Sequence, residues 1–187
     1  MSERLSAIEP LTAVERIESL SGRDLHDLCD ATEAAIDAGG GFGWLSPPPR
    51  QTLETYWKGV LLVPERKLFV ARLDKVIAGS AQLQRNARNN EAQAEVGQIT
   101  SHFLAPWARG HGLAGQMIEA IEVAARAAGV KVLNLDVRET QERAIQVYQS
   151  LGFKQWGHHP RYARADGAWV GGLYFTKSLD QEEGSAA

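Results

Sequence analysis

A glycine-rich segment in the second half of the chain, Gly110-His111-Gly112-Leu113-Ala114-Gly115, stands at the start of an amphipathic helix pattern. That pattern runs from Gly112 to Ala128, with apolar residues recurring at helical spacing. The first amide groups of a helix have no acceptor within the helix, and the helix dipole makes that end positive. Glycines let an anion approach the backbone closely, and Arg109 adds a positive charge at the entrance. The segment therefore predicts a site for a phosphate-containing ligand.

Helix and strand patterns fill the rest of the chain, and their order indicates the fold class. The predicted helices are Asp24 to Asp37, Gln51 to Leu62, Gly112 to Ala128 and Thr140 to Leu151. The predicted strands are Ala13 to Leu20, Lys67 to Leu73, Val76 to Gln84, Ala94 to Leu104, Lys131 to Val137, Phe153 to His158 and Ala168 to Ser178. Asp74-Lys75 and Asp166-Gly167 read as tight turns between antiparallel strands. We therefore expect one α/β domain over residues 1–179, with a mixed sheet and a polar, frayed tail over residues 180–187.

The composition is that of an ordinary soluble protein. Hydrophobic residues make up 44% of the 187 residues and charged residues 23%. A net charge of −3 argues against a nucleic-acid partner, because such proteins build up a basic face. The single cysteine, Cys29, lies in an apolar helical pattern and is expected to be buried, and no metal-ligand spacing is present. Without a signal-peptide pattern or an apolar run of about 20 residues, we expect a cytoplasmic protein with no membrane segment.

The same glycines also satisfy G-x-G-x-x-G, a pattern that binds the pyrophosphate of a dinucleotide. Asp136 follows about 20 residues later near a strand end, where a ribose-binding acid would stand. Against a dinucleotide fold, Pro106 and Trp107 interrupt the passage from strand into glycine turn. The motif also lies past the middle of the chain, which leaves too few residues for further βαβ units. An NAD-dependent oxidoreductase using Gly110 to Gly115 is therefore the less favoured interpretation.

Two stretches point to a different family. Leu104 to Ala114 resembles the acyl-CoA signature of GNAT acetyltransferases, Arg/Gln-x-x-Gly-x-Gly/Ala, and Arg109, Gly112 and Ala114 match its fixed positions. Leu135 to Val137 and then Ala144 to Phe153 resemble the next strand and the A-x-x-x-Y-x-x-x-G-F helix ending of that family. The resemblance covers most of the chain from Lys67 onward. It implies a GNAT-like acyl-CoA N-acyltransferase fold, with a mostly antiparallel sheet of about six or seven strands and about four helices.

The resemblance implies an N-acetyltransferase that moves an acetyl group from acetyl-CoA directly to a primary amine of a small molecule or peptide. In this family the pantetheine arm pairs with strand backbone, a role that falls here to Phe103 and Leu104. The residues expected to hold the pyrophosphate are Arg109, Gly110, His111, Gly112, Leu113, Ala114 and Gly115. Gln141 stands where the family commonly has asparagine, so its longer amide is expected to contact the pantetheine arm or a bound water.

Proton transfer needs an acid and a base. Tyr148 matches the family tyrosine that protonates the departing CoA thiolate, although its helical spacing alone favours a core position. The attacking amine must lose a proton, and Glu95 lies on the strand where some members carry a catalytic glutamate. His102 and a chain of water molecules are the alternative bases.

The acceptor amine is expected, from the resemblance, to lie between the loop that joins the N-terminal helices and the last strands. The residues predicted to contact it are Trp44, Asp136 and Tyr162. An aromatic ring such as Trp44 suits a cationic amine, and it suits core packing equally well. The sequence leaves open whether the acceptor is a small amine, an amino acid or a protein amine, and whether the protein is a monomer or a homodimer. It also leaves open an acyl-CoA-binding domain without turnover.

Overall fold

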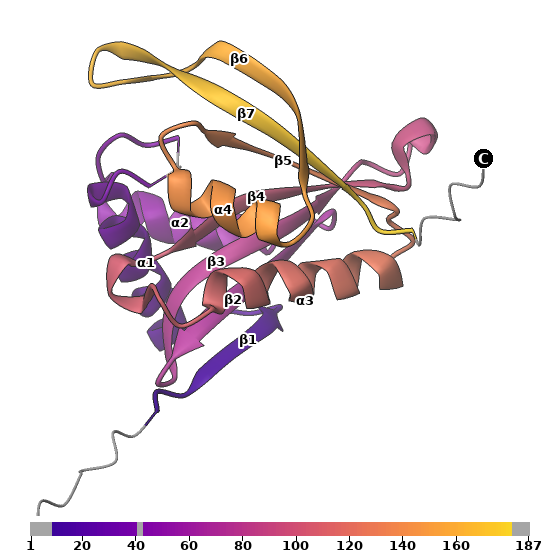
Figure 1. Cartoon of the computed structure of the whole chain (residues 1–187). Helices are drawn as coiled ribbons and strands as arrows, with labels where there is room; N and C mark the ends of the chain where they lie inside the picture. Colours follow the sequence, from indigo (N-terminus) through magenta and orange to yellow (C-terminus); the bar gives the residue numbers. More distant parts are fainter. Residues whose placement is uncertain (1–8, 41–42, 181–187) are drawn as a thin grey trace, which may run out of the picture.

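The structure, a computed structural model, describes residues 9–40 and 43–180. Its described part contains a seven-stranded sheet and four α-helices (Figure 1). In chain order these are β1 (Thr12–Ile17), α1 (Gly22–Asp37), α2 (Arg50–Val60), β2 (Arg66–Leu73), β3 (Val76–Arg85), β4 (Val96–Leu104), α3 (Leu113–Ala127), β5 (Val132–Arg138), α4 (Glu142–Ser150), β6 (Lys154–Ala165) and β7 (Ala168–Ser178). Two short 3₁₀ turns, Glu91–Gln93 and Pro106–Ala108, flank β4.

The strand order is β1-β2-β3-β4-β5-β7-β6, and neighbouring strands are antiparallel except β4 and β5. This confirms the expected mixed, mostly antiparallel sheet. The parallel step needs a crossover, which α3 supplies. Asp74 and Lys75 both have positive φ, as the tight turn between β2 and β3 requires.

Two strands end three or more residues from their predicted ends. The strand expected to end at Leu20 ends at Ile17, and the strand expected to end at His158 continues to Ala165. The pairing of β6 with β7 shifts between His159 and Ala163, so the strand continues through a bulge that its sequence pattern hides. This extension brings the second half of β6 back toward β5.

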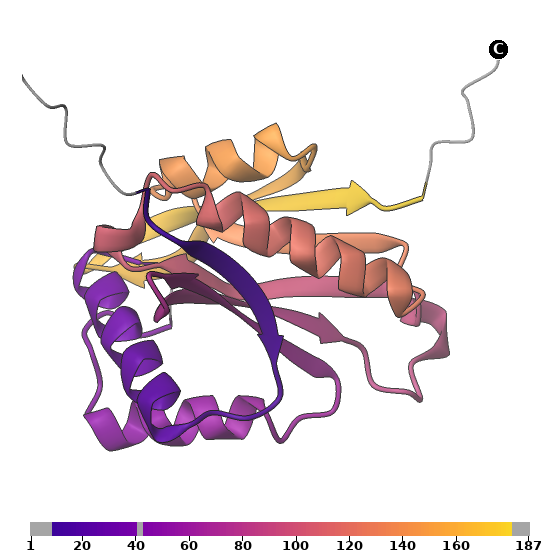
Figure 2. The same cartoon turned by 90° about the horizontal axis from the view of Figure 1, so that it is seen from below.

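Two hydrophobic cores lie on opposite faces of the sheet, because alternate residues of each strand face opposite ways. In β2, Leu68 and Val70 pack with α1 and α2, while Phe69 and Ala71 belong to the core beneath α3. Figure 2 shows α1 and α2 on the other side of the sheet from α3 and α4. The core between the sheet and helices α1 and α2 is called the first core. Cys29 is fully buried in it, as expected.

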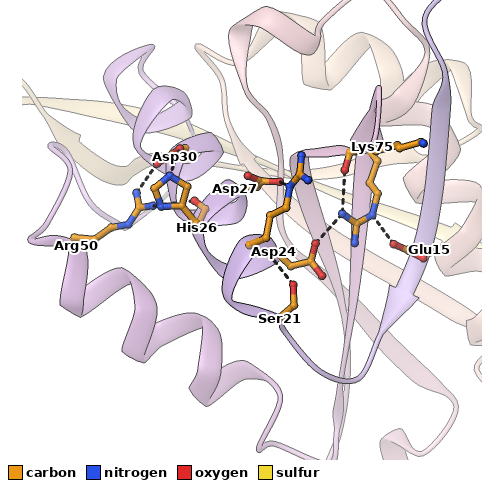
Figure 3. A network of polar contacts seen from close by, with 10 residues as sticks. Glu15, Ser21, Asp24, His26, Asp27, Asp30, Arg50 and Lys75 are labelled. Atoms are coloured by element: carbon orange, nitrogen blue, oxygen red, sulfur yellow. Dashed lines mark hydrogen bonds and ion pairs between the residues drawn. The ribbon is translucent and has the colours of Figure 1, made fainter.

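A network of charged side chains holds α1 against α2. The Arg50 guanidinium, at the first position of α2, donates to the Asp30 carboxylate at 2.6 Å and to the His26 carbonyl at 2.9 Å (Figure 3). Beneath it, the buried Trp57 indole donates to the Thr32 hydroxyl at 3.1 Å. These contacts join α1 to α2, and the loop between the two helices contributes Gly43 and Leu45 to the site described below.

Residues 1–8 and 41–42 of the expected domain, and all of the expected polar tail except Asp180, lie outside the described residues. Over residues 9–40 and 43–180, no helix is long and apolar enough to cross a membrane. The same residues contain no group of three or more His, Cys, Asp or Glu side chains placed to hold a metal ion.

Candidate active site

The strands β4 and β5 diverge in the middle of the sheet. Their pairing runs from Val96–Val132 to Gln98–Asn134. Beyond that point β4 continues to Leu104 and β5 to Arg138. A register shift and a positive φ of 49° at Ser101 bend β4 where the strands part. The divergence opens a gap with exposed strand backbone on its β4 side.

The strand β4 leads, through the short turn Pro106–Ala108, to the glycine segment at the start of α3. Gly112 is the N-cap residue and adopts a left-handed φ of 74°, with no side chain to cap the helix. Among the described residues, no hydrogen-bond acceptor is found for the amides from Gly110 through Gly115. A β-carbon at Gly115 would meet no atom within 4 Å. Consecutive unpaired amides at the positive end of a helix, facing open space, fit a pyrophosphate.

The side chains of the remaining predicted pyrophosphate residues lie in different places. Arg109 is exposed beside the segment, whereas Leu113 is fully buried in the core. The His111 Nδ1 atom donates back to the Ala108 carbonyl at 3.2 Å. Only backbone amides and the Arg109 charge are therefore suited to meet a phosphate there.

Leu104 and Phe103 face opposite ways along β4. The Ala105 amide donates to the Ala78 carbonyl of β3 at 2.8 Å. Because an antiparallel ladder alternates, Phe103 then directs its peptide groups toward β3, and Leu104 directs its own toward the gap. Of the two residues expected to pair with the pantetheine arm, Leu104 has the suitable orientation. The Phe103 ring is buried against α1 and α2.

A cavity of about 440 Å³ occupies the gap. Its walls come from β4, β5, α4, the second half of β6 and the loop between α1 and α2. The lining residues that bear polar or ionisable side chains are Thr100, Ser101, His102, Asp136, Arg138, Gln141, Tyr148, Tyr162 and Arg164. The consecutive elements β5, α4 and β6 thus bring Asp136, Tyr148 and Tyr162 to one cavity, as their predicted roles require.

The glycine that ends α4 positions Tyr148. Gly152 has a φ of 85°, and its amide donates to the Gln149 carbonyl at 3.0 Å. The next amide, of Phe153, donates to the Tyr148 carbonyl at 3.0 Å, which completes a Schellman ending. The Phe153 ring packs edge-on against the Tyr148 ring, with centroids 6.1 Å apart. The Gly-Phe pair of the motif therefore fixes the tyrosine that stands before it.

The Tyr148 hydroxyl contacts a histidine. Tyr148 is 4% exposed, and its Oη atom lies 2.8 Å from Nδ1 of His102. The other ring nitrogen, Nε2, lies 3.2 Å from the Ala114 carbonyl, which can only accept. Nε2 therefore carries the hydrogen, and Nδ1 accepts from Tyr148. Burial lowers the pKa of His102 to about 4, against the effect of the Ala114 carbonyl, so the imidazole is neutral at neutral pH.

Burial also acts on the tyrosine itself. It raises the pKa of Tyr148 well above the ordinary value, and the negative charge of Asp136 raises it further. Tyr148 therefore keeps its proton at neutral pH, which a general acid must do. Asp136 and Tyr148 line the same cavity, so the carboxylate lies near the phenol whose pKa it raises.

Asp136 forms the charged part of the cavity wall. It accepts hydrogen bonds from the Tyr162 hydroxyl and from the Gln98 amide, the latter at 3.2 Å. Burial and the bond to Asp136 raise the pKa of Tyr162 well above its ordinary value. The carboxylate belongs to the half-buried face of β5, opposite the core-facing Leu135 and Val137.

Three predicted residues have other contacts. Glu95 precedes β4, is 59% exposed and pairs with the Lys131 ammonium at 2.8 Å. Seven residues of extended chain separate it from His102, roughly 20 Å, so this position does not favour the base role expected for Glu95.

Gln141 donates to the Gly39 carbonyl at 2.7 Å, which ties α4 to the loop between α1 and α2. Trp44 packs edge-on against Tyr56 beside the first core and is not among the cavity-lining residues.

A series of hydrogen-bonded side chains next to the cavity was not predicted from the sequence. Tyr56 Oη lies 3.1 Å from the cavity-lining Ser101 Oγ, and the buried Gln82 amide donates to the same Tyr56 oxygen at 3.3 Å. No local pattern marks these residues. The contact depends on the bulge at Ser101, which arises only when β4 pairs with β3.

Comparisons with known proteins agree with this geometry. A model of the acetyltransferase (GNAT) family matches residues 28–153, which is more than half of the chain. The chain belongs to the GNAT acetyltransferase family. A protein from Azospirillum brasilense, described as an uncharacterized N-acetyltransferase in the hisH-hisA intergenic region, is 65% identical over 130 residues, 70% of this chain and 77% of that protein. Membership in this family excludes the NAD-dependent oxidoreductase considered above.

Solved structures share the GNAT fold. The putative acetyltransferase yncA from Salmonella typhimurium, solved with acetyl-CoA, superposes with a TM-score of 0.74 at 15% identity, covering 94% of this chain and 98% of that one. A GNAT phosphinothricin acetyltransferase from Sinorhizobium meliloti, in complex with AcCoA, gives a TM-score of 0.75 at 18% identity, covering 94% and 91%. At these identities the likeness establishes the fold alone.

Proposed function

We propose that this GNAT protein transfers an acetyl group from acetyl-CoA directly to a primary amine of a small molecule or peptide, with Tyr148 as the general acid. One observation carries the proposal. Tyr148 is among the residues that line the cavity between β4 and β5, and its hydroxyl is linked through His102 to the Ala114 carbonyl in the first turn of α3, where the unpaired amides lie. The hydroxyl of Tyr148, the backbone at the end of β4 and the anion-binding amides at the start of α3 therefore belong to one site.

Backbone groups of this protein would bind the donor, acetyl-CoA. The amides from Gly110 through Gly115 suit the pyrophosphate, and Arg109 adds charge beside them. The peptide groups of Leu104 suit the pantetheine arm. Acetyl-CoA supplies an activated thioester, whose carbonyl carbon is open to attack by a neutral amine.

Tyr148 balances the charge that develops on sulfur. As the new carbon–nitrogen bond forms and the carbon–sulfur bond breaks, Tyr148 gives its hydroxyl proton to the sulfur. The proton that leaves the amine nitrogen restores the phenol. The raised pKa of Tyr148 makes a lasting tyrosinate unfavourable, so the two proton transfers are expected to occur nearly together.

Asp136 gives the cavity an attraction for a cationic acceptor. Its carboxylate lines the cavity and has Tyr162 as a hydrogen-bond donor. An ammonium group drawn to this carboxylate must lose a proton before it attacks. His102 is a poor base, because its Nδ1 lone pair already accepts from Tyr148 and its pKa is about 4. We therefore propose that the proton lost by the ammonium group before the attack passes to water in the open cavity, beside Asp136.

The test is a broad panel of amines with acetyl-CoA, read by the release of free CoA thiol and by mass spectrometry of the acetylated product. Turnover with at least one amine is expected for the wild type. Tyr148→Phe should reduce kcat by about 10²- to 10⁴-fold. Tyr174→Phe is the matched control, because Tyr174 lies on β7 and is not among the residues that line the cavity.

Two outcomes would count against the proposal. Binding of acetyl-CoA without turnover on any amine would favour a non-catalytic acyl-CoA-binding domain. An unchanged rate in Tyr148→Phe would remove Tyr148 as the acid, even if the wild type is active.

A further inference from the structure

We propose that His102 is a positioning residue that holds the Tyr148 hydroxyl in its reactive place by linking it to the first turn of α3. The inference rests on the proposed function and adds a residue to it. It starts from a continuous chain of contacts: the Ala114 carbonyl, the His102 ring and the Tyr148 hydroxyl, at 3.2 and 2.8 Å.

The chain joins three elements that carry different parts of the site. Ala114 belongs to the helix start with the unpaired amides, His102 to the diverging end of β4, and Tyr148 to α4. The Tyr148 ring is already confined by Phe153 and Phe175, at centroid distances of 6.1 and 6.2 Å. What remains adjustable is the direction of the hydroxyl hydrogen. The imidazole fixes that direction.

The order of hydrogens along this chain follows from the partners. A carbonyl oxygen cannot donate, so Nε2 must, and a neutral ring then leaves a lone pair on Nδ1. The phenol hydrogen points to that lone pair. A ring flipped by 180° about its Cβ–Cγ bond would face both partners with carbon atoms in place of nitrogens. One tautomer and one ring orientation therefore satisfy both contacts.

This arrangement serves the acid in the free enzyme. The hydroxyl is kept at the cavity wall with its proton engaged, and the raised pKa of Tyr148 keeps that proton in place. When negative charge develops on sulfur, the hydrogen has only to turn about the C–O bond from nitrogen to sulfur. Because the other end of the imidazole is anchored on Ala114, the acid also keeps a fixed position relative to the helix start that suits the donor phosphates.

Two substitutions of His102 test the two hydrogen bonds of its imidazole separately. In His102→Asn the amide lies near the former Nδ1 and can still accept from Tyr148. In His102→Gln the longer amide lies near the former Nε2 and can still donate to Ala114, but the partner of Tyr148 is lost. We expect His102→Gln to lower kcat by about 10- to 100-fold, with the KM for acetyl-CoA nearly unchanged. His102→Asn should recover a large part of that loss.

A second measurement does not depend on turnover. NMR of protein with ¹⁵N-labelled histidine reports which ring nitrogen carries hydrogen. We expect His102 to be the Nε2–H tautomer at neutral pH, in protein without any ligand. In Tyr148→Phe the tautomer should persist, since Ala114 sets it, while the Nδ1 resonance moves because its hydrogen bond is gone. The Nδ1–H tautomer would overturn the inference, even if both His102 variants fail to fold.

Failure of the inference and failure of the proposed function can be told apart. If the wild type acetylates an amine and His102→Gln keeps the wild-type kcat, the positioning role is wrong and the function stands. If the wild type acetylates nothing while the Nε2–H tautomer is observed, the contact is real and the proposed function is wrong.

Discussion

The amide of Phe153 donates to the carbonyl of Tyr148 at 3.0 Å, so the residue that follows the α4 glycine fixes the residue proposed as the acid. The contact exists because Gly152 turns the chain with a φ of 85°. A residue with a β-carbon is strained in that conformation. The G-F ending thus has a physical role in the site as well as in the helix.

Gly152→Ala should therefore affect both stability and rate. We expect the free energy of unfolding to fall by about 1–2 kcal/mol, since the left-handed conformation is costly for alanine. The kcat should fall as well, because relaxation of the turn moves Tyr148, while the KM for acetyl-CoA should change little. Urea unfolding and steady-state kinetics measure the two effects. A loss of stability with an unchanged kcat would show that the turn does not control the acid.

Gly115→Ala should separate stability from donor binding. Gly115 lies within α3, has no positive φ and has open space where a β-carbon would stand, so alanine should stabilise the helix by about 0.5–1 kcal/mol. That same β-carbon would occupy the approach of a phosphate, so the KM for acetyl-CoA should rise by about tenfold or more.

Gly59→Ala is the matched control for this change. Gly59 lies in α2, also with open space around a new β-carbon, and outside the cavity lining. It should give a similar stability gain with no change in kinetics. If Gly115→Ala left the KM for acetyl-CoA as low as Gly59→Ala does, the phosphates would have to bind elsewhere.

Asp136→Asn should weaken acceptor binding selectively. The substitution keeps the shape of the side chain and removes its charge, so the KM for a cationic amine should rise by about tenfold while the KM for acetyl-CoA stays nearly constant. The pKa of Tyr162 should fall, because the carboxylate that raises it is gone. Kinetics and a spectroscopic tyrosine titration test these points. Asp166→Asn, in the exposed turn between β6 and β7, is the control.

Protonation of His102 should make the fold sensitive to mild acid. The unfolded histidine takes up a proton near pH 6.5, whereas the folded one does so only near pH 4. Between these values the unfolded state binds more protons, so stability falls as the pH falls from 6.5 to 4 and the contribution is complete above 6.5. The resulting loss in the free energy of unfolding is at most about 3 kcal/mol. It is smaller than this limit because the His102 ring borders the cavity, where solvent screens the charge.

His102→Asn removes this titration, so the comparison is made within one pair of proteins. Urea unfolding at pH 7.5 and at pH 5 should show a smaller loss of stability in the variant than in the wild type. The other histidines and carboxylates contribute equally to both proteins and cancel in the difference. Equal losses would show that the folded His102 is protonated as readily as the unfolded one.

Local patterns in the sequence determined the elements and the binding segment. Apolar spacing predicted four helices, and the glycines before Leu113 predicted an anion site, because helix starts and glycine backbones have the same physical properties in any fold. The A-x-x-x-Y-x-x-x-G-F pattern pointed to Tyr148 only through its resemblance to the GNAT family, because helical spacing alone favours a core position for this residue. The helices and the anion site depend on neighbours within a few residues.

Tertiary structure decided what those residues meet. The divergence of β4 from β5, the bond between His102 and Tyr148, and the position of Glu95 beside Lys131 all depend on strand register and on contacts between distant segments. Residue spacing within one strand cannot reveal which end of that strand faces the cavity, and so it could not separate Glu95 from His102. The neutral state of His102 was equally out of reach, because burial and a carbonyl from another element set its pKa only after the chain has folded.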